Sequence, residues 1–280
     1  MKKVLIGLAA FAALFVLSTS SCTKSTTHTV TNTDTVTVVD TLKPPVGDTT
    51  YKHINDSLWA YYPLNGNLGD SSGNNHVLTL VGGGVSLGYD LWGNPQGALD
   101  FTAGSSYGEI ADGANFNAAN FSVSLFVMYR QLDGYLFTKV DYGNAFGGTF
   151  NVGMSPTQDI GIVRLAINTD VTNPCGDLTV SGYDIKDTTS ESIQTYAWYH
   201  VVITFTNGVG TLYINSKLVA TQTIPIPQLT ECTNAPFILG NWWSQDNNPA
   251  LNGKIDELRI YSRALSVKEI AYLYTNFTTK

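Results

Sequence analysis

The chain has 280 residues and a formal net charge of −7, because 22 Asp and Glu outnumber 15 Lys and Arg. The basic residues form no cluster, which excludes nucleic-acid binding, since that depends on positive charge that neutralises phosphates. The same deficit argues against an acidic polysaccharide held on a broad basic face and favours a neutral ligand.

The N-terminus has the pattern of an export signal. Lys2 and Lys3 precede an uncharged apolar run over residues 4–17, and small residues follow it. The run is too short to span a bilayer, which needs roughly 20 apolar residues. We therefore predict a signal peptide over residues 1–21.

Residues 17–22 resemble the lipobox of bacterial lipoproteins, although Ser18 and Thr19 stand where an aliphatic residue is usual. The resemblance implies cleavage before Cys22, acylation of its sulfur and a lipid anchor in the cell envelope. We expect that anchor in the outer membrane, on its periplasmic or its surface face. The alternative is ordinary secretory cleavage, with Cys22 incidental.

Residues 22–50 differ in composition from the rest of the chain. After Cys22 the segment is rich in Thr, with Val and Asp interspersed, and Pro44 and Pro45 follow. Because large apolar residues are lacking, we expect a solvated, mostly extended tether between the membrane and the domain that follows. The alternation of Thr and Val leaves a strand as the alternative.

Residues 51–280 are predicted to form one large β domain, because neither a Pro- or Ser-rich linker nor a repeat of fixed period interrupts them. Residues 121–129 begin as an alternation of apolar and polar side chains, and residues 199–205 place alternate apolar side chains on one face. Turn signals recur about every 8–12 residues, which indicates a sandwich.

A hairpin and a helix are predicted near the C-terminus. Residues 211–214 and 217–220 alternate as strands around Asn215, which can adopt the positive φ of a two-residue turn. Ser266 and Glu269 match a capping box, and an apolar face follows them. We expect one short helix that packs as a lid against a sheet edge.

Cys175 and Cys232 remain as a pair once Cys22 is acylated. Both lie in polar loop sequence, and an exported protein folds in an oxidising compartment, so we predict a disulfide between them. A metal site at these two residues is disfavoured, because no further Cys or suitably spaced His joins them.

Three blocks of the domain carry a family resemblance. They are residues 59–67 with 70–76, residues 107–112 with 121–129, and residues 198–205 with the hairpin and 253–266. In this order they resemble the laminin-G-like domains of the concanavalin A-like lectin/glucanase superfamily, over residues 58–274. Phe126 stands where that family usually has Trp, and Asn215-Ser216 replaces the usual Asp-Gly.

The resemblance implies an all-β fold, a jelly-roll β-sandwich of two antiparallel sheets, one of them concave, with one short C-terminal helix. It implies less about function, because the fold hosts lectins, carbohydrate-binding modules, adhesion domains, glycosidases and lyases.

Catalysis is not expected. Glycosidases of this superfamily carry clustered carboxylates on one strand, since glycoside hydrolysis needs two carboxyl groups that flank the bond. The five Glu do not form that pattern, and no obvious nucleophile or base partner accompanies the four His. His200 lies within a predicted strand, and we expect it to be structural.

The strand around Asp256 has an irregular pattern. Leu258 and Ile260 share a face, and strict alternation turns Asp256 inward with them. Ile255 is out of phase, so a bulge is expected at Asp256 or Glu257.

A calcium ion is predicted at Asp70 and Asp256. An inward carboxylate needs a partner, and the loop of residues 65–75 around Asp70 is rich in the oxygen donors that calcium prefers. Laminin-G-like domains often hold calcium at such a loop. The alternative is that Asp256 caps backbone amides of this loop, or pairs with Arg259 or Lys254.

A Trp pair is the most unusual feature of the domain. Adjacent residues of a strand point to opposite faces, so one Trp is expected in the core and the other exposed. An exposed aromatic face among amides and carboxylates is a common sugar platform. The predicted ligand-binding residues are Asn241, Trp242, Trp243, Gln245, Asp246 and Asn247. The alternative is local packing of both Trp at a loop base; a second candidate platform comprises Tyr142, Asn144 and Phe146.

The sequence therefore predicts a non-catalytic lipoprotein of the cell envelope that binds a neutral polysaccharide or glycan, for capture or adhesion. One alternative is a protein-interaction or structural envelope module without a sugar ligand. The other is an atypical glycoside hydrolase or polysaccharide lyase.

Overall fold

The computed structural model divides the chain into two units, Met1–Thr49 and Thr50–Lys280. It describes residues 24–29, 35–40, 52–102, 104–116, 119–140, 147–154, 161–176, 178, 182–187, 193–226, 228–229, 231–233, 235–242 and 250–278. No helix within these ranges is long and apolar enough to cross a membrane.

The first unit contains two paired strands. β1 (Lys24–Thr29) and β2 (Thr35–Asp40) run antiparallel, with Thr27 opposite Thr37. The alternation of Thr and Val therefore forms a strand, which was the less favoured interpretation of this segment. The role of the segment as a tether stays a prediction, and Cys22 lies outside the described residues.

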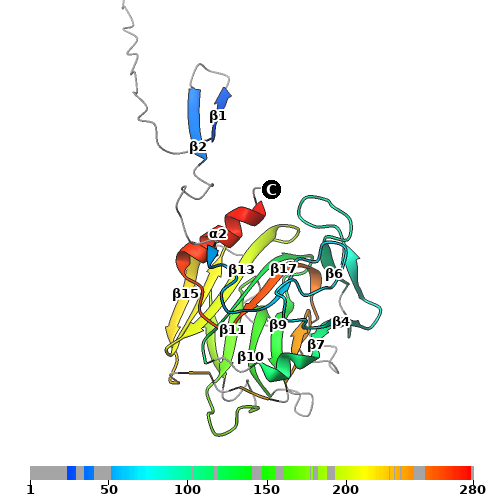
Figure 1. Ribbon diagram of the computed structural model, residues 1–280, viewed down its shortest axis with the longest axis vertical. Helices are drawn as coiled ribbons and strands as arrows, with labels where there is room; N and C mark the ends of the chain where they lie inside the picture. The colour runs from blue at the N-terminus through cyan, green and yellow to red at the C-terminus, as the bar shows by residue number, and fades with distance from the viewer. Residues whose placement is uncertain are drawn as a thin grey trace, which may run out of the picture. The chain divides into compact units, whose positions relative to one another are not determined.

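The second unit is a sandwich of two antiparallel sheets (Figure 1). One sheet has eight strands, and β3 (Leu58–Tyr62) joins it by pairing with its long central strand β17. The other seven run in the order β15 (Lys217–Thr223), β14 (Val209–Ile214), β13 (Trp198–Thr206), β8 (Phe121–Tyr129), β17 (Asn252–Tyr261), β6 (Ala98–Thr102) and β5 (Val85–Gly88).

The second sheet has seven strands, and the 3₁₀ helix η2 (Ala111–Asn115) follows one of them. Their order is β12 (Gly182–Lys186), β11 (Arg164–Asn168), β10 (Gly148–Met154), β9 (Gly134–Val140), β16 (Phe237–Leu239), β7 (Tyr107–Ile110) and β4 (Leu78–Val81). Two antiparallel sheets with one C-terminal helix confirm the predicted fold class.

The core lies between the two sheets and follows the period-two alternation of the strands. Val123, Leu125 and Val127 of β8 point inward, and Phe121 stacks on Phe150 of β10 with ring centroids 4.7 Å apart. Full burial of each such side chain contributes about 1.5–3 kcal/mol. The outward residues of β8 include Phe126, which lies under the helix.

The predicted hairpin and capping box are both present. Asn215 and Ser216 adopt left-handed φ values of 50° and 62° at the turn between β14 and β15. The helix α2 (Val267–Thr278) begins with the amide of Glu269 donating to Ser266 Oγ at 3.3 Å, and the amide of Ser266 donates to Glu269 Oε2 at 2.7 Å.

The prediction that the helix packs against a sheet edge was wrong. α2 lies over the outer face of the eight-stranded sheet, where Ile270 and Leu273 pack with Val202 and Tyr261 (Figure 1). The reason is that the outer face of the central strands carries apolar side chains among its polar ones: Phe277 stacks on Phe126 at 3.7 Å, and covering this apolar surface holds the helix on the face.

The bulge in β17 is confirmed, and it corrects the expected orientation of Asp256. The register with β8 shifts between Asp256 and Arg259, and Glu257 has a φ of 51°. Asp256 pairs with Phe126, so it lies on the helix-covered outer face and not inward with Leu258. Strict alternation failed because the extra residue of the bulge reverses the faces beyond it.

Candidate functional site

The outer face of the seven-stranded sheet carries a row of directly opposed side chains, most of them polar. Directly opposed residues of neighbouring strands share a face. The register places Asn151, Thr138, Ile238, Glu109 and Thr79 side by side across β10, β9, β16, β7 and β4. Their chain neighbours, such as Phe137 and Phe237, face the core.

Gly240 turns the chain out of β16 so that the following residues lie on this outer face. Its φ is 77°, and a Cβ atom there would approach the Phe101 ring to 2.4 Å, so only glycine fits. Thr138 Oγ1 then donates to the carbonyl oxygens of both Asn241 and Trp242, each at 3.2 Å.

Trp242 is the packed member of the Trp pair. It is 6% exposed, its ring lies 4.6 Å from that of Tyr135, and it belongs to an apolar cluster with Tyr107 and Ile238. Asn241 beside it is fully buried. The other predicted ligand-binding residues, Trp243, Gln245, Asp246 and Asn247, lie outside the described residues, as do Tyr142, Asn144 and Phe146.

The predicted disulfide is confirmed. Cys175 and Cys232 are bonded, with their Cα atoms 4.8 Å apart. The amide of Cys232 donates to Thr149 Oγ1 at 2.8 Å, and the amide of Gly148 donates to the carbonyl of Gly176 at 3.2 Å. The disulfide thus fixes two connecting segments against the start of β10.

Lys139 of β9 is a buried polar residue that the sequence did not single out. Its ammonium is inaccessible to solvent and donates to the carbonyls of Gly113, Cys232 and Ala235 at 2.9–3.1 Å. Burial lowers the pKa of Lys139 to about 8, and Glu231, with its Oε2 3.6 Å away, opposes that change. With its donors committed to these oxygens, Lys139 is a structural group that closes one end of the core.

Asp70 caps the loop of residues 65–75. Its carboxylate accepts from the amides of Tyr61, Ser72 and His76 at 2.8–3.0 Å and from the Ser72 hydroxyl at 2.8 Å. Burial alone would raise the pKa of Asp70, but these hydrogen bonds outweigh it and lower the pKa.

The donors around Asp70 do not fit a calcium ion. Calcium needs six to eight oxygen ligands, whereas the groups that face this carboxylate are N–H and O–H donors. Within the described ranges, no three His, Cys, Asp or Glu residues are grouped to hold a metal. Calcium at Asp70 and Asp256 stays a prediction, and this geometry argues against it.

His76 and His53 have carboxylate partners, contrary to expectation. His76 Nδ1 lies 2.6 Å from Asp112 Oδ2 and its ring stacks on Trp59 at 3.5 Å, while His53 pairs with Asp56 at 2.7 Å. The His76 pair joins residues far apart in the sequence, which periodicity does not reveal.

His200 has the structural role that its strand position predicts. It is fully buried, its Nε2 lies 2.8 Å from Ser124 Oγ, and its ring stacks on Phe126 at 4.5 Å. Burial, together with a smaller contribution from the charge of Arg259, lowers the pKa of His200 to about 3, so the ring is neutral in the folded protein.

Solved structures similar to this chain include sugar-binding domains. Domain 4 of AbnA, a GH43 extracellular arabinanase from Geobacillus stearothermophilus, in complex with arabinotriose, is 27% identical with a TM-score of 0.59; the match covers 78% of this chain and 98% of that one. The serotype D botulinum neurotoxin binding domain is 19% identical with a TM-score of 0.59, covering 82% and 53%.

The same serotype D domain in complex with N-acetylneuraminic acid is 20% identical, with a TM-score of 0.58, over 81% of this chain and 52% of that one. The chain spans about half the length of these toxin domains, and at such identities the likeness shows the fold alone.

Among curated proteins, no sequence relative was found. The family model of the concanavalin A-like lectin/glucanases superfamily, laminin-G type, matches residues 102–271, which is more than half of the chain. The chain therefore belongs to the concanavalin A-like lectin/glucanases superfamily.

Proposed function

We propose that this protein is a non-catalytic glycan-binding module that uses the outer face of the seven-stranded sheet. The observation that carries the proposal is its likeness to the arabinanase domain. That domain matches over 98% of its own length at 27% identity, and its structure holds arabinotriose.

The outer face of the seven-stranded sheet supports the start of the proposed binding segment. Tyr135 is half-buried, whereas Tyr107, Trp242, Asn151 and Thr138 are buried beneath the segment that follows Gly240, which they hold in place on this face. Sugar sites combine aromatic faces with a few fixed polar groups. Because Trp242 is packed, the proposed stacking platform is Trp243, the next residue in the chain.

The expected ligand is a neutral oligosaccharide. The chain has a net charge of −7, and removal of Lys2 and Lys3 with the signal peptide would make it more negative. A polyanionic glycan would have to overcome this repulsion, whereas a neutral one would not.

A glycan array probed with the purified protein tests this proposal, followed by calorimetric titration with arabinotriose. We expect binding of one or more neutral oligosaccharides and about a tenfold loss in Trp243→Ala. Release of new reducing ends from a bound glycan would instead indicate a hydrolase. An array without any hit would favour the module that interacts with proteins.

We also propose that Cys22 carries a lipid and anchors the protein in the cell envelope, on the evidence of residues 17–22. Cys22→Ala should move the protein from the membrane fraction to the soluble fraction, and only the parent should incorporate labelled palmitate. Equal fractionation of both proteins without label would reject the anchor.

A further inference from the structure

A cavity of about 120 Å³ opens on the outer face of the eight-stranded sheet, between α2, the bulge of β17 and the turn at residues 52–57. The two sheets pack against each other through the core, so this cavity lies on the opposite side of the sandwich from the face proposed above. The lining used below comprises Asn55, Glu257, Arg259, Tyr272, Asn276 and Phe277.

The bulge of β17 forms the polar floor of the cavity. Strict alternation would send Glu257 into the core with Ile255, but the extra residue brings it to the outer face beside Arg259. Glu257 adopts a left-handed φ of 51°, a conformation that residues other than glycine rarely take. Such strained residues and bulges concentrate at functional sites.

Three side chains hold this floor in one arrangement. Glu257 Oε2 accepts from the Tyr61 hydroxyl at 2.9 Å and from Arg259 Nη2 at 2.8 Å. The guanidinium of Arg259 lies over the Tyr61 ring, 3.8 Å from its centroid. A guanidinium carries five N–H donors, more than one carboxylate oxygen can accept, so Arg259 can also donate to a ligand.

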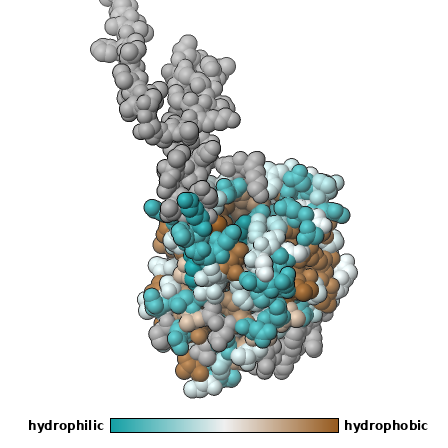
Figure 2. Space-filling view, in the orientation of Figure 1, coloured by the Kyte–Doolittle hydropathy of each residue, from teal (hydrophilic) through white to brown (hydrophobic). Residues whose placement is uncertain are grey.

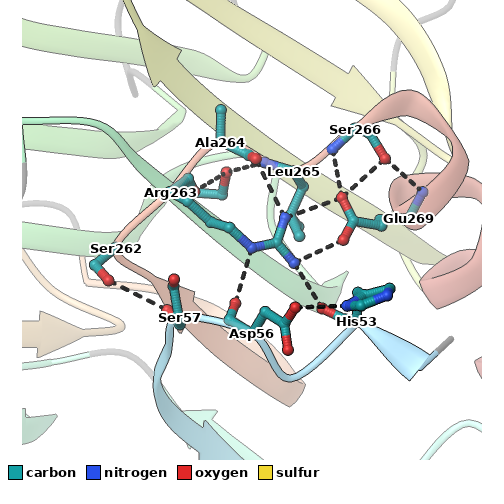
Figure 3. Close-up of polar contacts among 10 residues, drawn as sticks. His53, Asp56, Ser57, Ser262, Arg263, Ala264, Leu265, Ser266 and Glu269 are labelled. Atoms are coloured by element: carbon teal, nitrogen blue, oxygen red, sulfur yellow. Dashed lines mark hydrogen bonds and ion pairs between the residues drawn. The ribbon is translucent and has the colours of Figure 1, made fainter. Parts of the chain in front are cut away.

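The walls of the cavity are fixed by a second polar network (Figure 3). Arg263 donates from Nε to the carbonyl of Asp56 at 2.8 Å and from Nη2 to that of His53 at 2.9 Å. Its Nη1 donates to Glu269 Oε2 at 3.0 Å in the first turn of α2. The turn and the helix are thereby tied together without a ligand, and a preformed site loses less entropy on binding.

The rest of the cavity is lined by an aromatic ring and by side-chain amide groups. Phe277 packs on Phe126 at 3.7 Å and on Trp92 at 4.4 Å, while Asn55 and Asn276 are exposed at the rim. Hydrophilic residues gather around α2 on the surface seen in Figure 2. A hydrocarbon surface opposite amide, guanidinium and carboxylate groups suits a ligand with an apolar ring face and several hydroxyls.

The volume and the charge of the cavity further limit the class of ligand that it can bind. A volume of about 120 Å³ is well below the roughly 300–1,000 Å³ of a drug-sized site, so the cavity can enclose at most part of one sugar residue, with the rest at its open rim. Glu257 and Arg259 cancel in charge, and Asp256 lies next to them in the chain. An anion would therefore meet no net positive charge.

We propose that this cavity binds one uncharged sugar residue and is a second site, distinct from the face of the seven-stranded sheet. It does not depend on the first site, because the two lie on opposite sides of the sandwich.

The test uses Asn276→Trp, which fills the cavity from its exposed rim, and Lys268→Trp as the matched control, because Lys268 is exposed on the same helix but outside the lining. Backbone amide NMR shifts of the ¹⁵N-labelled protein are followed with arabinose, galactose and glucose, and with N-acetylneuraminic acid as the acidic probe.

At least one neutral sugar should shift the amides of residues 54–55, 257–259 and 272–277, with a Kd on the order of 1 mM. Asn276→Trp should weaken this binding at least about tenfold, and Lys268→Trp should leave it unchanged.

The proposal is overturned if none of the neutral sugars shifts these amides at concentrations well above 1 mM, if only the acidic sugar does, or if Asn276→Trp binds like the parent. The Trp243→Ala variant separates the two sites: it should keep the helix-side shifts even where the sheet-face proposal fails.

Discussion

The outer faces of the two sheets are covered in different ways. The eight-stranded sheet is covered by α2, which the charged pair of Arg263 and Glu269 ties to the turn before β3. The seven-stranded sheet is covered by connecting segments, which are held by Trp242 packing and by the disulfide of Cys175. The first cover combines apolar packing with an ion pair, and the second combines aromatic packing with a disulfide, so different perturbations should loosen each.

The largest expected effect is on the seven-stranded side. Trp242→Ala should lower the free energy of unfolding by about 3–5 kcal/mol, because it empties a packed site beside Tyr135 and Ile238. Trp243→Ala should leave stability nearly unchanged and weaken glycan binding about tenfold. Denaturant titration and calorimetry measure the two quantities. If both variants melt early and the folded fraction of each binds glycan normally, the two Trp residues serve only in packing.

Reduction of the disulfide should have the next largest effect. Its cysteines are 57 residues apart, and loss of the cross-link should cost about 2–4 kcal/mol. Melting of the parent with and without reductant checks this, with the Cys175→Ala/Cys232→Ala variant as a control that should not respond to reductant. Two alkylatable thiols in the unreduced protein would contradict the bond itself.

Arg263→Ala tests the ion pair and hydrogen bonds that tie α2 to the turn before β3. It removes hydrogen bonds to two carbonyls and to a buried carboxylate, and it should cost about 1–3 kcal/mol. Arg263→Lys retains the charge without the planar fork, so it should recover only part of that loss. Hydrogen exchange should show that α2 is loosened first, while the seven-stranded sheet keeps its protection. Uniform loss of protection would show that the two covers are not independent.

The buried His200 makes the helix side sensitive to acid. Its folded pKa of about 3 lies below the unfolded value of 6.5, so the unfolded state binds the proton first. The contribution to stability is complete above pH 6.5 and is lost as the pH falls towards 3, by up to about 1.4 kcal/mol per pH unit. In this window the His200→Phe/Ser124→Ala variant should show a shallower pH dependence; an equal slope would refute this origin.

Calcium should have the smallest effect. The N–H and O–H groups around Asp70 leave no oxygen cage, so neither calcium nor a chelator should shift the melting temperature. If calcium instead raises the melting temperature, and Asp256→Ala abolishes that increase, the calcium site that the sequence predicts is supported.

The sequence predicted the features that depend on neighbouring residues. The turn at Asn215, the cap formed by Ser266 and Glu269 and the strand of residues 121–129 each follow from local pattern. The disulfide followed from counting cysteines once Cys22 was assigned to lipid.

Features that depend on strand order were not predictable in this way. One extra residue at Glu257 reverses the face of Asp256, and period-two alternation does not say on which side of that residue the phase changes. The row that joins Asn151 to Thr138 and Ile238 depends on which distant strands become neighbours. The burial of Lys139 has the same origin, because its three carbonyl partners come from segments far from β9 in sequence.

The position of the last strands has a consequence for how the chain folds. Among the described strands, β16 and β17 come last in sequence, yet each lies in the interior of its sheet, and β17 joins β8 to both β6 and β3. Neither sheet can close until residues 237–261 are available. Folding of the sandwich must therefore await residues 237–261, with slow closure of long-range pairs. Before those residues are made, β8 and β9 lack partners that complete their sheets, and an incompletely paired polypeptide is the state that can be threaded through a narrow pore.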